Sequence, residues 1–106
     1  MIITNSDTIA GKKIVKTIGL VKGNTIRARH LGHDIGAMFR GIIGGEISEY
    51  TKLLAESREQ ALDRMVNEAQ SKGANAIVTA RFATSQILSG AAELLSYGTA
   101  VVVEDE

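Results

Sequence analysis

The spacing of apolar residues along the chain alternates between a strand-like and a helix-like period. Residues 13–28 are rich in β-branched side chains and predict a strand, and Ile2–Thr4 predicts a short edge strand before it. Gly19, or the pair Gly23-Asn24, would permit a bulge or a tight turn in the longer strand. Its even-numbered apolar positions predict the buried face: Ile14, Ile18, Leu20, Ile26 and Ala28.

Two helices are expected next. Apolar residues recur every three or four positions from Leu31 to Ile43, which predicts a first helix interrupted by three glycines. Glycine is unfavourable inside a helix, so these glycines indicate close packing against a neighbour. Ser48 is a candidate N-cap for a longer second helix, which Lys72-Gly73 would end. Its apolar stripe comprises Tyr50, Leu54, Ala61, Met65 and Ala69.

The C-terminal third predicts a β-hairpin. Residues 75–83 have strand character, Ser89-Gly90 offers a turn, and residues 92–103 form the last strand. The run from Ala91 to Val103 is apolar on both faces, whereas a strand with one face in water normally alternates. A short chain has little structure to cover both faces, so the run predicts self-assembly. We expect one face of small residues to lie against a neighbouring subunit: Ser96, Gly98 and Ala100.

These elements predict a single α+β domain spanning residues 1–106. Its order would be strand, two helices and β-hairpin, with an antiparallel sheet packed on the long helix.

The 106 residues are 44% hydrophobic and 23% charged, which is ordinary for a globular domain. No cysteine is present, so disulfides, thiolate metal sites and thiol catalysis are excluded. The N-terminus does not resemble a signal peptide and no apolar run is long enough to span a bilayer, so we expect a cytoplasmic protein with no membrane partner.

Charge is distributed unevenly, although the net charge is zero. Residues 1–40 contain seven basic and two acidic side chains, and residues 41–106 contain five basic and ten acidic ones. One subunit's basic half could meet the acidic half of the next, or the basic half could contact a polyanion. Two solvated faces without a partner are an equally good interpretation.

His30 and His33, with Asp34 beside them, are the candidate metal ligands. Imidazole and carboxylate groups suit divalent transition metals such as zinc, nickel or copper(II), and symmetry in an oligomer could complete the coordination. Histidines near the start of a helix are, however, commonly capping or solvated residues. No other cofactor is implied.

Other motifs give little support to an enzyme. Gly41-Ile42-Ile43-Gly44-Gly45 lacks the Lys-Ser/Thr of a phosphate-binding loop and offers nothing to RNA, so nucleic acid is an unlikely partner. Tyr50 and Arg58 are eight residues apart, a little over two helical turns, and would point nearly the same way. With Glu59 they could form a polar cluster at a subunit boundary, with Arg58 buried there. Arg58 and Glu59 could equally be a solvated surface pair.

Several segments together resemble the YbjQ-like family of small bacterial proteins. The segments are Gly19–Gly23, GIIGGEISEYTKLLAESREQA at 41–61, GANAIV at 73–78 and YGTAVVV at 97–103. The resemblance implies a dodecin-like α+β subunit in a ring-shaped homo-oligomer, most simply a pentamer, and a heavy-metal-binding label. Tyr50 and Arg58 match the family's helix, whereas Glu46 replaces a basic residue common in the family.

Three hypotheses about function follow. The first is a ring-forming, non-enzymatic binding or scaffold protein whose ligand, if it has one, sits between subunits. The second is a metal-binding or metal-sensing protein that uses His30, His33 and Asp34. The third is an enzyme with an interfacial site around Tyr50 and Arg58.

Overall fold

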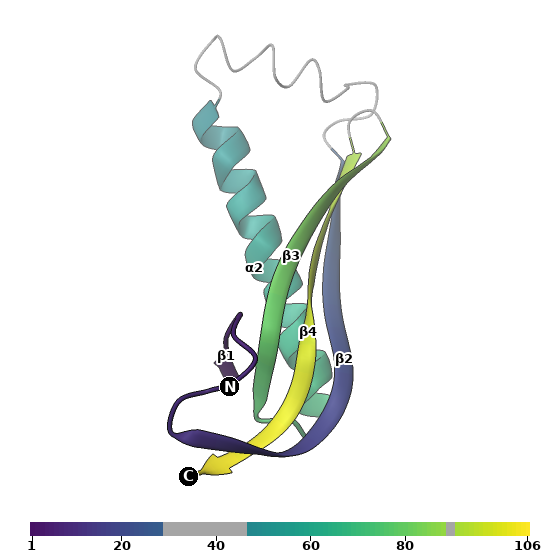
Figure 1. The fold of residues 1–106 in the computed structure, drawn as a ribbon. Helices are drawn as coiled ribbons and strands as arrows, with labels where there is room; N and C mark the ends of the chain where they lie inside the picture. Colours follow the sequence, from purple (N-terminus) through teal and green to yellow (C-terminus); the bar gives the residue numbers. More distant parts are fainter. Residues whose placement is uncertain (29–46, 89–90) are drawn as a thin grey trace.

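The computed structural model describes residues 1–28, 47–88 and 91–106. It contains one long helix and four strands: β1 (Ile2–Ile3), β2 (Lys12–Ala28), α2 (Ile47–Ser71), β3 (Ala76–Leu88) and β4 (Ala91–Asp105). The class α+β is confirmed, with α2 packed on one sheet (Figure 1). The first predicted helix, Leu31 to Ile43, lies outside the described residues, as does the Ser89-Gly90 turn.

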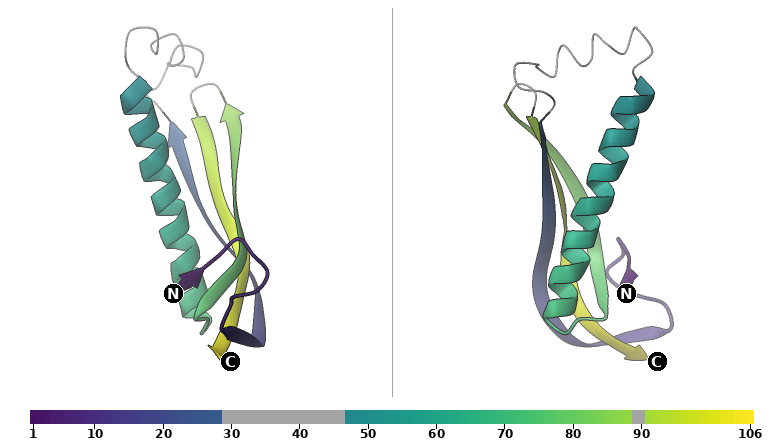
Figure 2. Two further views of the ribbon diagram at one scale, coloured as in Figure 1. Left: turned by 60° about the vertical axis from the view of Figure 1, so that its left-hand side comes forward. Right: turned by 180° about the vertical axis from the view of Figure 1, so that it is seen from behind.

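The strands form one mixed sheet in the order β1-β3-β4-β2. β4 is the central partner of β2 and β3, and both pairings are antiparallel. The expectation of a wholly antiparallel sheet is wrong because β1 pairs in parallel with β3, with Ile2 opposite Ala76. β1 and β2 lie at opposite edges of the sheet, so the chain crosses from one edge to the other between them (Figures 1 and 2). β1 runs alongside β3 in the same direction.

Helix α2 has the apolar stripe that the sequence predicts. Ala61, Met65 and Ala69 are fully buried, and Ser57 joins them. The helix ends as expected at a glycine: Gly73 has φ +86° and donates its N–H to Gln70 O at 3.0 Å. Ala74 N–H reaches back to Ala69 O, also at 3.0 Å. These two bonds satisfy the last carbonyls of the helix as a Schellman motif does.

The helix packs mainly on β2 and β4 and lies closest to β2 (Figure 2). Gly23 lies directly under the helix backbone, at Ala61 O and Met65 N. Two side chains of α2 also bind backbone groups of β2. Arg64 donates to Asn24 O at 2.5 Å, and Glu68 accepts from Lys22 N–H at 3.4 Å.

The buried face of β2 differs from the predicted one. Leu20 is 64% exposed and Ile26 is 59% exposed, whereas Val21 and Thr25 are buried under the helix. Ile14, also expected to be buried, is 40% exposed. The cause is the register of β2 against β4, which shifts between Ile14 and Lys16 and again between Thr17 and Gly19, where Gly19 has φ +133°. Such a bulge changes which parity of residues faces the core. Ile18, which lies in the bulge without a partner on β4, packs against the core, whereas Leu20, after the bulge, does not.

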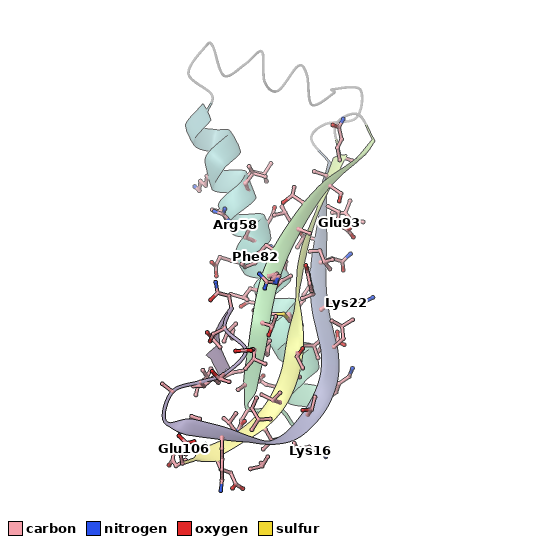
Figure 3. The ribbon with its side chains drawn as sticks, in the orientation of Figure 1. Lys16, Lys22, Arg58, Phe82, Glu93 and Glu106 are labelled. Atoms are coloured by element: carbon pink, nitrogen blue, oxygen red, sulfur yellow. The ribbon has the colours of Figure 1, made fainter. Side chains whose placement is uncertain are left out.

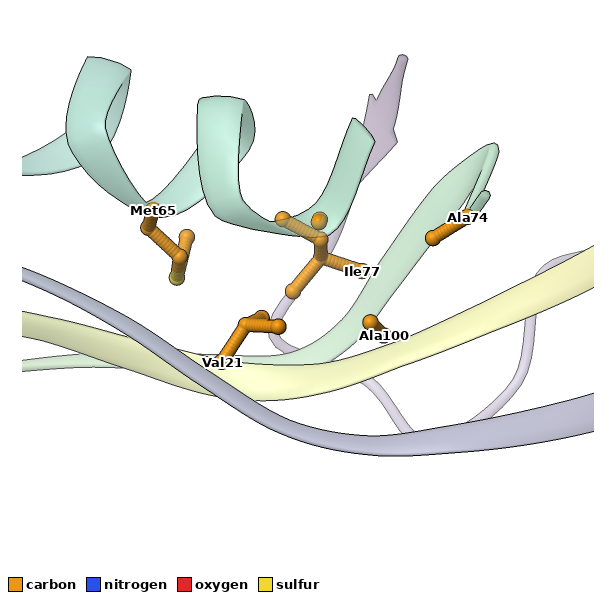
Figure 4. Close-up of a cluster of buried hydrophobic side chains, with 6 residues drawn as sticks. Val21, Met65, Ala74, Ile77 and Ala100 are labelled. Atoms are coloured by element: carbon orange, nitrogen blue, oxygen red, sulfur yellow. The ribbon is translucent and has the colours of Figure 1, made fainter. Parts of the chain in front are cut away.

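Two apolar clusters hold the subunit together. The larger one lies between α2 and the sheet (Figure 4) and comprises Val21, Met65, Ala69, Ala74, Ile77 and Ala100. The smaller one lies around alternate positions of β3 and β4 and comprises Ala76, Val78, Val101 and Val103, with Ile9 packed against it. Alanine and valine dominate both clusters, so the helix and the sheet approach closely.

Gly23→Ala should destabilise the protein. The added Cβ would lie 2.7 Å from Arg64 Cβ and closer still to the helix backbone, which cannot rotate away. We expect a loss of about 1–3 kcal/mol in the free energy of unfolding, typical of overpacking. Urea denaturation at fixed protein concentration measures this. Thr17→Ala, at an exposed position of the same strand, should change stability by no more than about 0.5 kcal/mol; equal losses in both variants would contradict the close packing.

The ion pair between Lys12 and Asp105, which joins the ends of β2 and β4, should depend on pH. The hydrogen bond from Lys12, followed by its positive charge, holds the pKa of Asp105 below its ordinary value of 3.8. Because the pKa is lowered in the folded state, the stabilisation is complete above the ordinary value and is lost as pH falls through the lowered pKa. NMR titration should show Lys12→Gln raising the pKa of Asp105, whereas Lys13→Gln should leave it unchanged.

Candidate functional site

The three small residues expected at a subunit interface lie under the helix of their own chain. Ser96 is 1% exposed and its hydroxyl lies 3.3 Å from Met65 Sδ. Ala100 is fully buried in the larger cluster. A Cβ on Gly98 would stand 2.7 Å from Ile77 Cγ2. Their small size therefore lets α2 and β3 pack on β4, and these buried positions are not free to meet a neighbour.

The chain also covers more of the last strand than its length suggests. Val101 and Val103, on the opposite face from Ala100, are buried in the smaller cluster with Ile9 from the N-terminal segment. Further up β4, this opposite face carries Leu95, Tyr97 and Thr99, which are only half-buried. Apolar sequence on both faces is thus explained partly by the N-terminal segment, and the uncovered part is confined to residues 95–99.

The other candidate residues are less completely placed. Arg58 is exposed on α2 (Figure 3). Tyr50 belongs to the same helix, but its side chain lies outside the described residues, as do His30, His33 and Asp34. Within residues 1–28, 47–88 and 91–106, no group of three or more His, Cys, Asp or Glu side chains could hold a metal ion. The same part of the chain has no helix long and apolar enough to cross a membrane.

The sheet has one surface that α2 does not cover, which we call the open sheet face. Cross-strand partners share a face of a sheet, so the register gives its rows directly. Lys22 is opposite Tyr97, and Tyr97 is opposite Arg81 on the other side. The flanking rows are Leu20 with Thr99, and Asn24 with Leu95 and Ala83.

The open sheet face carries two cations in one row, and Glu93 lies on the same face two rows farther along β4. Lys22 and Arg81 are exposed, and in the described part of the chain neither side chain forms an ion pair with an acidic residue. The nearest acidic residue along β4, Glu93, accepts a hydrogen bond from Asn24 Nδ2 at 3.0 Å. On the other side of β2, Glu68 is held by Lys72 at 3.1 Å. The row Lys22–Tyr97–Arg81 thus presents two positive charges on either side of a tyrosine.

The large apolar side chains that remain exposed lie at the two sides of the sheet. In the described residues, one group belongs to the edge formed by β1 and β3, and the other belongs to β2. We call these the β1–β3 edge (Met1, Ile2, Ile3 and Phe82) and the β2 edge (Ile14, Val15, Leu20 and Ile26). Each is 36–64% exposed, and none lies on the central strand β4. Phe82 is opposite Ser96 and so lies on the helix side of β3, where α2 does not cover it.

Sequence reasoning missed both of these surfaces. Lys22, Arg81 and Tyr97 are distant in sequence and form no motif, so only the strand register brings them together. Ile14, Leu20 and Ile26 are exposed although the apolar pattern of β2 predicts that they are buried. The pattern of apolar residues does not show the bulge next to Gly19. A glycine in an otherwise regular strand was the one available signal.

Comparison with known proteins places the chain in a family. The family model YbjQ_1, described as "Putative heavy-metal-binding", matches residues 1–104. A UPF0145 protein of Dehalococcoides mccartyi is 58% identical over 104 residues, covering 98% of this chain and all of that protein. A UPF0145 protein of Methanosarcina acetivorans is 54% identical over 103 residues, covering 97% of each.

A solved structure supports the fold. It is a protein of unknown function of the DUF74 family from Pediococcus pentosaceus, with a TM-score of 0.68 over 98% of both chains and 15% sequence identity. The likeness at this identity concerns the fold alone. The family match and the close relatives span almost the whole chain, so the protein belongs to the YbjQ family.

Proposed function

We propose that the protein is a ring-forming homo-oligomeric binding or scaffold protein rather than an enzyme, with any ligand held between subunits. A cytoplasmic pentamer of dodecin-like subunits is the form that the resemblance implies. The observation that carries the proposal is the pair of apolar edges. Phe82 is 52% exposed at one edge and Leu20 is 64% exposed at the other. Full burial of such a side chain contributes about 1.5–3 kcal/mol, and each of these two leaves roughly half of that unrealised in the single subunit.

The position of these edges favours a ring over a two-fold dimer. The β1–β3 edge and the β2 edge are different surfaces on opposite sides of one sheet. If one subunit's β2 edge contacts the β1–β3 edge of the next, each of the two subunits keeps its other edge free for a further contact. Head-to-tail contacts of this kind close into rings when the rotation between subunits permits.

The shape of the subunit also supports assembly. Its extents are 53 × 21 × 16 Å and its radius of gyration is 17.0 Å. A compact domain of this length has a radius of gyration of about 13 Å. An elongated subunit with one helix layer buries less apolar surface than a compact one, so contacts between copies would add burial that the single chain does not provide.

A metal-binding function is the second candidate, and the description of the matching family favours it. The residues proposed for it remain His30, His33 and Asp34. Imidazole nitrogens and a carboxylate suit zinc, nickel or copper(II), and the absence of cysteine disfavours softer ions.

Charge introduced at either edge should break the assembly. Phe82→Glu alters the β1–β3 edge and Val15→Glu alters the β2 edge, where Val15 is 46% exposed. In a head-to-tail ring every contact uses both edges, so each variant alone should be monomeric at micromolar concentration. Mixing the two should give dimers, because one intact edge remains on each partner. Native mass spectrometry measures all three states.

A matched control is Asn67→Glu, which adds the same charge on the solvent side of α2. It should keep the wild-type subunit number. A wild-type monomer would defeat the assembly proposal, and variants whose mixture stays monomeric would exclude head-to-tail contacts between these edges.

For the metal candidate, calorimetric titration of untagged protein with zinc, nickel and copper(II) should show binding that His30→Ala and His33→Ala each abolish. Loss of one imidazole removes a ligand that the remaining groups cannot replace. Glu56→Gln, an exposed carboxylate on α2, should bind as the wild type does. Unchanged binding in both histidine variants would remove this site.

A further inference from the structure

We infer that the row Lys22–Tyr97–Arg81 on the open sheet face is a binding strip for single-stranded nucleic acid. The strip crosses three adjacent strands, with one residue from each of β2, β4 and β3. It lies within a single subunit, so the inference does not rest on the ring. It also revises the expectation from local motifs, which gave nucleic acid no site.

The two cations set the chemistry of the ligand. Lys22 and Arg81 are two strand spacings apart, which is about 10 Å between their backbones. Lys22 projects from β2 at the edge of the sheet (Figure 3), and Arg81 belongs to β3 on the other side of β4, so the two charges are spread across the sheet. Cations spread across a surface suit successive phosphates of a chain better than one small anion, and side chains without an acidic partner need no ion pair broken before they bind.

Tyr97 supplies the second element of recognition. It is half-buried in the central strand, between the two cations, and the neighbouring positions Leu95, Thr99 and Ala83 carry no charge. A ring on a flat sheet surface offers a stacking platform to any base, and an adjacent cationic path holds the backbone. Bases of a duplex are already stacked and paired, so this arrangement favours a single strand.

Within residues 1–28, 47–88 and 91–106, the segments outside the sheet pack away from the strip. α2 packs on the other side of the sheet, and Ile9 from the N-terminal segment packs farther down, against Val101 and Val103. Among the described acidic residues, Glu93 bonds Asn24 and Glu68 bonds Lys72. In the acidic C-terminal tail, Asp105 forms an ion pair with Lys12 at the start of β2, ten residues before Lys22.

Fluorescence anisotropy with a labelled oligothymidylate of 12 nucleotides tests the strip. Wild-type protein should bind at low salt, with a dissociation constant that rises as salt is added. Lys22→Gln and Arg81→Gln should each weaken binding and lower the slope of log K against log salt by about 0.7, the value for one phosphate contact on a single strand. Tyr97→Leu should weaken binding about 5- to 150-fold with no change in slope, because stacking releases no counterions. Tyr97→Phe keeps the ring and should stay within about twofold of wild type.

Lys16→Gln is the matched control, because it removes the same charge from β2 at a position opposite Val102 and outside the row. It should leave the salt slope unchanged.

Three outcomes would contradict the strip: no binding of the oligonucleotide, an equal loss of affinity in Lys16→Gln and Lys22→Gln, or equally tight binding of a duplex of the same length. Displacement by thymidine monophosphate or inorganic phosphate at matched phosphate concentration would overturn it in favour of a small anion. Because Lys22 and Arg81 are exposed, their variants decide the question even if Tyr97→Leu lowers stability, and native mass spectrometry of each variant separates loss of binding from loss of assembly.

Discussion

The close approach of α2 to β2 at Gly23 determines how the rest of the subunit is arranged. A glycine at this point lets the helix backbone rest on an edge strand, and Arg64 and Glu68 then reach backbone groups of that strand. Side chains that satisfy edge groups also guard the edge against uncontrolled strand addition. Because the helix packs mainly on β2 and β4, it covers Ile77 on the helix side of β3 but not Phe82 farther along the strand, which is exposed.

The same arrangement makes the two faces of the sheet different in kind. One face is closed by α2 through small residues, and the other is closed only in part, where Ile9 packs near Val101 and Val103. The part of the second face around Leu95, Tyr97 and Thr99 remains uncovered, and so do the two apolar edges. Assembly and ligand binding rely mainly on different side chains: the edges carry the large apolar residues, whereas the row through Tyr97 carries charge and an aromatic ring. The two surfaces meet at Leu20, which belongs to the β2 edge and also flanks Lys22.

Sequence reasoning recovered the elements whose signals are local. The stripe of Ala61, Met65 and Ala69 defines α2, and the glycine at 73 ends it, because helix periodicity and capping depend on neighbours in sequence. It failed where a distant partner decides the outcome. The bulge at Gly19 reversed the buried face of β2, the N-terminal segment covered Val101, and α2 rather than a second subunit covered Ser96. Each of these outcomes depends on which distant segment packs against the residue, and the local sequence pattern does not contain that information.

The row through Tyr97 shows why the candidate site was harder to find than the fold. A motif in sequence marks residues that act together through one loop or helix, whereas a sheet brings residues together through register. Lys22, Arg81 and Tyr97 are each ordinary surface residues in sequence, and they gain meaning only as cross-strand neighbours on a face without a second layer. A one-residue slip of β3 or β2 against β4 would turn a cation to the helix side and leave Tyr97 with one charged neighbour. The packing at Gly23, which fixes β2 under the helix, therefore also fixes the chemistry of the opposite face.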